Sequence, residues 1–154
     1  MSILKTSKPH EIVKPIDEID IQIIELLSAN ARMSLKDISS MVHLTTPAVS
    51  TRIEKLEKSG LIKGYHAEID LEHLGYKIKA FILISVEPEN QENFYTFIRA
   101  EECVRECSHI TGVYSMLLKV VFKSTSELDT FIGRLQSFGK TETQVVFSTI
   151  LERQ

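Results

Sequence analysis

Residues 16 to 64, IDEIDIQIIELLSANARMSLKDISSMVHLTTPAVSTRIEKLEKSGLIKG, carry the clearest structural signal in the chain. Their apolar residues recur at helical spacing in three short segments, which are separated by turns too short to be linkers. Three amphipathic helices joined this tightly must pack against one another at an angle. The spacing therefore predicts a helix-turn-helix, a unit that places its last helix in the DNA major groove.

Each expected helix has a start signal. Asp17, followed by Asp20 three residues later, has the spacing of a capping box at the start of the first helix. The remaining signals are Ser34 before a helix over 35 to 42, and Thr45 or Thr46 before a helix that carries Pro47 in its first turn and ends near Gly60.

The two faces of the third helix differ in chemistry. At about 100° per residue, its apolar stripe is formed by Val49, Ile53 and Leu56, and its opposite face by Pro47, Thr51, Glu54, Lys55 and Lys58. Small hydroxyl residues suit base edges and lysines suit phosphates, although any solvated helix also carries such residues. The candidate DNA contacts are Thr46, Ser50 and Thr51 for bases, and Lys55, Lys58 and Arg52 for phosphates. Arg52 falls beside the core stripe, so an internal ion pair with a helix acid is an equal alternative.

The second half of the chain alternates strands and helices. An extended hinge or strand over 62 to 69 is followed by the expected elements: strand 80 to 87, helix 90 to 101, strand 104 to 111, strand 116 to 122, helix 125 to 138 and strand 143 to 151. The order βαββαβ predicts a ferredoxin-like domain, and the whole chain is expected to be α+β. We expect a flexible arm over 1 to 15, a helix-turn-helix domain over 16 to 64, a hinge over 65 to 79 and the ferredoxin-like domain over 80 to 154.

One sheet face is expected to need a partner. The strand from residue 80 is apolar on both sides, with Phe81 and Leu83 opposite Ile82 and Ile84, while both helices cover the same face. The uncovered apolar face predicts a homodimer related by a two-fold axis, the alternative being a monomer that tolerates this surface.

Charge and composition narrow the class of protein. Of the formal net charge of −3, residues 1 to 64 hold +1 and residues 65 to 154 hold −4, so one DNA-binding unit should bind phosphate weakly and gain affinity by assembly.

The two cysteines, Cys103 and Cys107, are weak evidence for a metal site and fit a reducing cytoplasm. The N-terminus has no signal-peptide pattern and no stretch has the length of a membrane span, so we expect a cytoplasmic protein without a membrane partner.

A pattern of spaced residues carries a resemblance to a known family: I-D-x-x-D, A-R-x-S, D-I-S-x-x-V, L-T, V-x-x-R-I-x-x-L-E and G-L-I-x-G-Y, between Ile16 and Tyr65. With the second half, it closely resembles the leucine-responsive regulatory protein family (Lrp/AsnC) over nearly the whole chain. The resemblance implies a winged-helix-like helix-turn-helix, sequence-specific binding to double-stranded DNA, no catalysis and no cofactor. It also implies dimers that assemble into octamers and a small amino-acid effector.

In this family a loop with the pattern T-G-D-x-D helps to hold the effector. The corresponding loop here is Thr111, Gly112, Val113, Tyr114 and Ser115, with Thr141 and Thr143 in the segment near the last strand. Both acidic positions are absent, so neither Val113 nor Ser115 can pair with an ammonium group. Gly112 is also explained as an ordinary hairpin residue.

Three functional hypotheses follow. The first is a transcriptional regulator of the Lrp/AsnC type. The second is an effector-independent protein that shapes DNA, favoured by the missing carboxylates. The third is an enzyme similar to the sirohaem decarboxylases that resemble this family, for which His66 and His109 leave room although no paired acid and base stand out.

Overall fold

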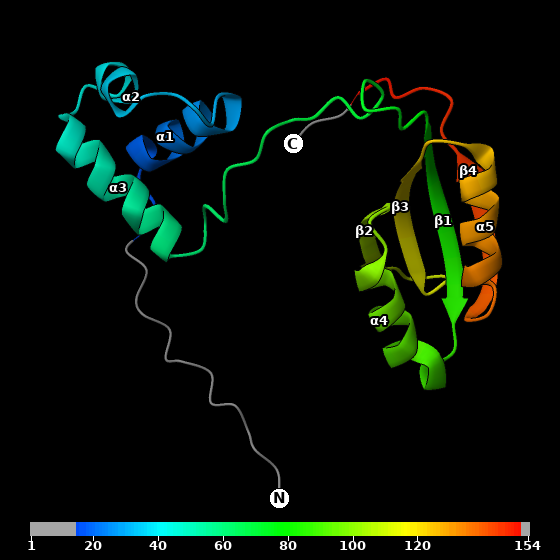
Figure 1. The fold of residues 1–154 in the computed structure, drawn as a ribbon. Coiled ribbons are helices and arrows are strands. Elements are labelled where there is room, and N and C mark those ends of the chain that lie inside the picture. Colours follow the sequence, from blue (N-terminus) through cyan, green and yellow to red (C-terminus); the bar gives the residue numbers. More distant parts are fainter. Residues whose placement is uncertain (1–14, 152–154) are drawn as a thin grey trace, which may run out of the picture. The chain divides into compact units, whose positions relative to one another are not determined.

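The computed structural model describes residues 15–151 in two compact units, one that extends to Glu68 and one that begins at Ile69. Most of the expected arm over 1 to 15 lies outside the described residues. The elements are α1 (Glu18–Ala29), α2 (Leu35–Met41), α3 (Thr46–Lys58), β1 (Ile78–Val86), η1 (Pro88–Asn90), α4 (Gln91–Ala100), β2 (Val104–His109), β3 (Met116–Phe122), α5 (Thr125–Leu135) and β4 (Gly139–Val145) (Figure 1).

The first unit is a three-helix domain whose helices start at the expected caps. Asp17 and Asp20 form a full capping box at α1, Ser34 caps α2, and Thr45 caps α3. The helices enclose a small core of six buried residues: Ile23, Ile38, Val42, Val49, Ile53 and Leu56. The helix-turn-helix expectation is confirmed, including the buried stripe of α3.

The turn between α2 and α3 is closed by a helix C-cap. His43 adopts a left-handed conformation (φ 54°), and the N–H of Leu44 donates to the carbonyl of Ser39 at 3.0 Å. This is the hydrogen bond of a Schellman motif, which ends a helix and turns the chain within a few residues. It sets the direction in which α3 leaves α2.

The outer apolar residues of α2, Leu35 and Met41, are exposed, because a helix of seven residues directs only Ile38, Ser39 and the C-cap Val42 inward. The stretch 62 to 69 forms no strand within the described residues, so of the two alternatives the extended hinge is the one present. A strand requires a neighbouring backbone for its hydrogen bonds, and none pairs with this stretch in the part of the chain that is described.

The second unit is a four-stranded antiparallel sheet in the order β2-β3-β1-β4, with α4 and α5 on one face (Figure 1). This arrangement confirms the ferredoxin-like βαββαβ expectation. Alternate residues of β1, from Ala80 to Val86, are buried against the helices together with Phe94, Leu118 and Phe131. Ser124 caps α5, while the Glu127 carboxylate accepts from the N–H of Lys123.

The last strand lies earlier than expected. It was placed at 143 to 151, but β4 is Gly139–Val145, paired with β1 from Val86 to Ala80. The apolar residues that suggested the later position lie beyond the strand, where Phe147 is 100% and Ile150 is 99% exposed. The edge strand itself is polar, so its pairing with β1, and not its own hydrophobicity, determines where it lies.

No helix covers the second face of the sheet in the described unit, and we call this the open face. It carries Phe81 and Leu83 of β1 and Leu117 of β3, all half-buried, and the buried Val121. These apolar residues confirm the alternation that was read from the sequence, while Lys119 of β3, opposite Phe81 in the register, shares the same face.

Candidate functional site

The exposed face of α3 is the first candidate surface. Thr46, Thr51, Lys55 and Lys58 are exposed and Ser50 is half-buried, while the opposite side of the helix is packed in the core. The hydroxyl residues lie in the first two turns and the lysines in the last turns. The helix therefore offers small hydrogen-bonding groups at its N-terminal end and mobile positive charges at its C-terminal end.

Several of these side chains already have local partners. The Thr51 hydroxyl donates to the carbonyl of Pro47 at 3.0 Å, and the hydroxyls of Thr46 and Ser39 lie 3.4 Å apart. Lys58 lies 3.6 Å from Glu54, but both side chains are largely exposed. Exposed pairs one helical turn apart contribute little, so Lys58 can exchange Glu54 for another anion at small cost.

Arg52 is not on the exposed face. Its Nη1 atom lies 2.7 Å from Asp17 and 2.6 Å from Asp20, so the internal ion pair, one of the two alternatives from the sequence, is formed. Hydrogen bonds to Asp17 and then Asp20 raise the pKa of Arg52. The backbone N–H of Asp20, followed by the Arg52 guanidinium, holds the pKa of Asp17 below its ordinary value.

The start of the hinge is attached to the helical unit, which the sequence did not indicate. The Tyr65 hydroxyl donates to the Glu57 carboxylate of α3 at 2.8 Å. Burial, and secondarily this hydrogen bond, raises the pKa of Tyr65 to about 12. A hollow of about 260 Å³ lies between α1 and this segment, lined by Ile24, Leu27, Ser28, Ala31, Leu61, Ile62, Lys63, Gly64, Tyr65 and His66.

The loop over 111 to 115 joins β2 to β3. Gly112 has φ 119°, a conformation that favours glycine, and Val113 at the tip is 85% exposed. Ser115 has a structural role: its N–H donates to the carbonyl of Ile84, and its hydroxyl accepts from the N–H of Val86 at 3.0 Å. The loop is thereby fastened to the end of β1.

A carboxylate does reach this loop, from a neighbouring strand. The Tyr114 hydroxyl donates to Glu142 of β4 at 2.9 Å, and this hydrogen bond raises the pKa of Tyr114. Thr141 and Thr143 lie opposite Ile84 and Ile82 in the register, on the helix-covered side of the sheet, and both are half-buried. Because residues alternate along a strand, Glu142 points to the other side. Sequence reasoning missed Glu142, since only the pairing of β4 with β1 brings it to the loop.

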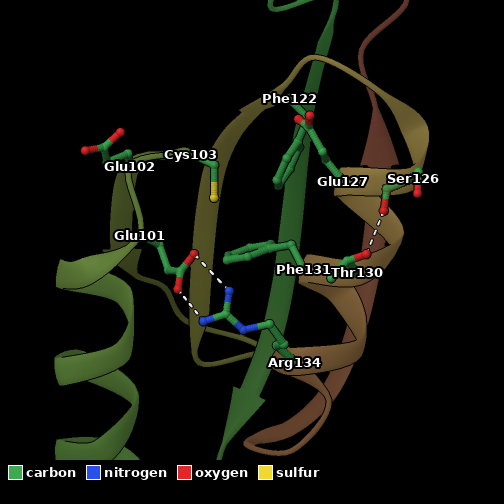
Figure 2. Close-up of a pocket in the computed structure, with 9 residues that line it drawn as sticks. All are labelled: Glu101, Glu102, Cys103, Phe122, Ser126, Glu127, Thr130, Phe131 and Arg134. Atoms are coloured by element: carbon green, nitrogen blue, oxygen red, sulfur yellow. Dashed lines mark hydrogen bonds and ion pairs between the residues drawn. The ribbon is translucent and has the colours of Figure 1, made fainter.

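A further hollow of about 380 Å³ lies between α5 and the start of β2 (Figure 2). The Cys103 side chain points into it, and Arg134 of α5 bridges to Glu101 with two hydrogen bonds. Arg134 also stacks on Phe97, 4.6 Å from the ring centroid. Burial raises the pKa of the Cys103 thiol to about 11, which keeps it protonated and a poor nucleophile at neutral pH.

Residues 15–151 contain no group of three or more histidine, cysteine or acidic residues that could hold a metal ion. Nor do they contain a helix that is long and apolar enough to cross a membrane.

Comparison with known proteins agrees with this architecture. Residues 16–63 match the family described as winged helix-turn-helix DNA-binding, and residues 79–154 match the Lrp/AsnC ligand binding domain. The uncharacterized HTH-type transcriptional regulator YezC of Bacillus subtilis (strain 168) is 37% identical over 134 residues, which cover 87% of this chain and 95% of that protein.

Solved structures are similar over nearly their full length. The structure of B. subtilis LrpC has a TM-score of 0.86 at 29% identity and covers 91% of this chain and 100% of its own. The complex of the transcriptional regulator NMB0573 from Neisseria meningitidis with L-Met has a TM-score of 0.85 at 25% identity, covering 90% of this chain and 94% of its own. A helix-turn-helix unit, a ferredoxin-like unit and these relatives together establish that the chain belongs to the Lrp/AsnC family.

Proposed function

We propose that this chain is a sequence-specific transcriptional regulator that binds double-stranded DNA through α3. The observation that carries this proposal is the division of α3 into a buried stripe and an exposed face with hydroxyls at one end and lysines at the other. Thr46, Ser50 and Thr51 would contact bases, and Lys55 and Lys58 would contact phosphates. Relatives named HTH-type transcriptional regulators support the same function, and no catalytic step is part of it.

The active form in this proposal is a homodimer that assembles further, up to an octamer. The apolar open face supports it, because a second copy related by a two-fold axis would cover the same residues on both chains. Two copies of α3 would enter successive major grooves about 34 Å apart. Residues 1–15 would act as an arm and residues 65–79 as the hinge between the two domains, in a protein that works in the cytoplasm with the DNA.

The proposed effector is a small amino acid that binds at the loop over 111 to 115. Support comes from relatives solved with methionine, the N. meningitidis regulator and the feast or famine regulatory protein Rv3291c of M. tuberculosis. Thr111, Gly112 and Tyr114 would line the site, and Glu142 is the carboxylate within reach of the loop. Thr141 and Thr143 point to the opposite side of the sheet from Glu142, so they are left out of the proposed site. The exposed Val113 adds an apolar surface at its rim.

The test is selection of bound duplexes from a random DNA pool at near-physiological salt, with and without millimolar L-methionine or a mixture of the other amino acids. We expect enrichment of a pseudo-palindrome with half-sites about one helical turn apart. A change in affinity or in the selected spacing on adding an amino acid would support the effector part. Binding without any sequence preference would overturn the proposal in favour of the second candidate, a DNA-shaping protein, which the absence of carboxylates at positions 113 and 115 favours.

A further inference from the structure

Arg52 lies on the helix that is proposed to enter DNA, yet its guanidinium is bound to two acids of another helix. We propose that Arg52 is a positioning residue, which fixes α3 to the N-terminus of α1 and does not contact DNA. This inference rests on the proposed function, because the position of α3 matters only if α3 binds DNA.

The two acids are arranged so that each has one carboxylate oxygen available to Arg52. In Asp17 one carboxylate oxygen accepts from the N–H of Asp20 at 2.9 Å, and the other accepts from Arg52. In Asp20 one oxygen accepts from the N–H of Asp17 at 3.2 Å, and the other accepts from Arg52. Each carboxylate therefore uses one oxygen to cap α1 and the other to hold α3.

This arrangement lowers the usual cost of an ion pair. Most surface pairs contribute little because two long side chains must be ordered to form them. Here the capping box already fixes both acids before Arg52 arrives, so less side-chain entropy is lost. The Asp20 side chain is only 16% exposed and that of Arg52 27%, which strengthens the attraction relative to an exposed pair.

Charge and position argue against a phosphate contact by Arg52. One guanidinium between two carboxylates leaves a local charge of −1, and a phosphate that approached Arg52 would also approach both acids. The adjacent residue Ile53 is in the core, whereas Lys55 and Lys58 lie on the exposed face. The phosphate-binding charge of α3 is thus placed away from Arg52.

The two roles predict opposite effects of D20N. If Arg52 binds phosphate, removal of a competing acid should tighten DNA binding. If Arg52 positions α3, the same change should weaken binding, because the less exposed of its two ion pairs at the start of α1 is lost and only the pair with Asp17 remains. The amide oxygen of the new side chain can still accept the N–H of Asp17 that completes the capping box. We expect D20N to bind the duplex enriched in the selection above about three- to tenfold more weakly, the range typical of coupled contacts.

The matched control is E25Q, which removes one negative charge from an exposed position of the same helix without touching Arg52. E25Q should bind DNA as well as the wild type or slightly better. Helix content and thermal unfolding, followed by circular dichroism, would ensure that affinities are compared well below the melting temperature. D20N binding as tightly as the wild type, or more tightly, would overturn the inference.

A double-mutant cycle gives an independent readout that a loss of stability alone would not produce. For a positioning role, R52Q weakens DNA binding and D20N adds no further loss in the R52Q background. For a phosphate contact, D20N does not weaken binding in either background. If the wild type enriches no duplex at all, the proposed function fails first, and this outcome differs from a wild type that binds while D20N remains unimpaired.

Discussion

A phosphate contact by Lys55 can be tested through the salt dependence of DNA binding. It is exposed in the last turns of α3, on the face opposite the core. Each phosphate neutralised by a lysine releases counterions, so K55A should weaken binding to all duplexes alike and reduce the slope of log affinity against log salt by about 0.9. Fluorescence anisotropy at several salt concentrations measures this slope. R99A, which removes an exposed positive charge from α4, should leave it unchanged, and an unchanged slope for K55A would remove Lys55 from the interface.

His43 carries backbone strain at the turn between α2 and α3. Its φ of 54° costs a residue with a Cβ about 1–2 kcal/mol, and a β-branched residue is still less suited to it. We expect H43V to lower the free energy of unfolding by about 1–2 kcal/mol, and H43G to leave it within about 0.5 kcal/mol, since glycine removes the strain but loses more chain entropy. Urea unfolding followed by circular dichroism measures both values. Equal stability of the two variants would contradict a strained turn.

The contacts made by Arg52 and Glu142 could not be predicted from the sequence alone. The sequence placed Arg52 beside the core but left two roles open, because the choice depends on how far α1 lies from α3 in space. Glu142 was not singled out, since its contact with Tyr114 joins positions 28 residues apart. Caps and turns depend on neighbours within a few residues and were predictable, whereas these contacts depend on tertiary packing.

Among the elements, the bounds of β3 were predictable from its own sequence, whereas those of β4 were not. The apolar run from Met116 to Phe122 was predicted with its observed bounds, because a central strand that is buried on one face and half-buried on the other reads as continuous hydrophobicity. The edge strand β4 carries Lys140, Glu142 and Gln144 on one side, so its own pattern is weak. The last strand was therefore predicted too late in the chain, over the apolar residues after Val145, which form no strand with β1.

Gly139 at the start of β4 allows this edge strand to approach β1. A Cβ at this position would lie 1.9 Å from the carbonyl oxygen of Ser85, which is a backbone atom that cannot move aside. G139A should therefore lower the free energy of unfolding by about 2–4 kcal/mol, as other changes that force backbone shifts do. G133A is the matched control, because a Cβ there, in the last turn of α5, meets nothing within 4 Å and alanine favours a helix. G133A should raise stability by about 0.5–1 kcal/mol; similar losses in both variants would contradict the close approach.

For the whole molecule, assembly and DNA binding are linked through charge. The half of the chain that holds α3 has a formal charge of only +1, so one copy should bind DNA weakly, and affinity must come from two copies acting together. In the proposed dimer, the open face would supply the surface for such pairing, and the helices α4 and α5 do not cover it (Figure 1). Leu117 is suited to test this link, since it lies on that face beside Leu83 and is only half-buried.

We expect L117K to separate the dimer without unfolding the chain, because a lysine in an apolar two-fold interface meets its own copy or an apolar surface. Sedimentation equilibrium should show a monomer, and affinity for a duplex with two half-sites should fall roughly a hundredfold, while affinity for a single half-site stays unchanged. T96K adds the same charge at an exposed position of α4 and should change neither quantity. If L117K remains a dimer, the open face is not the interface, and if it becomes a monomer with full affinity for the paired site, α3 does not require a second copy to bind.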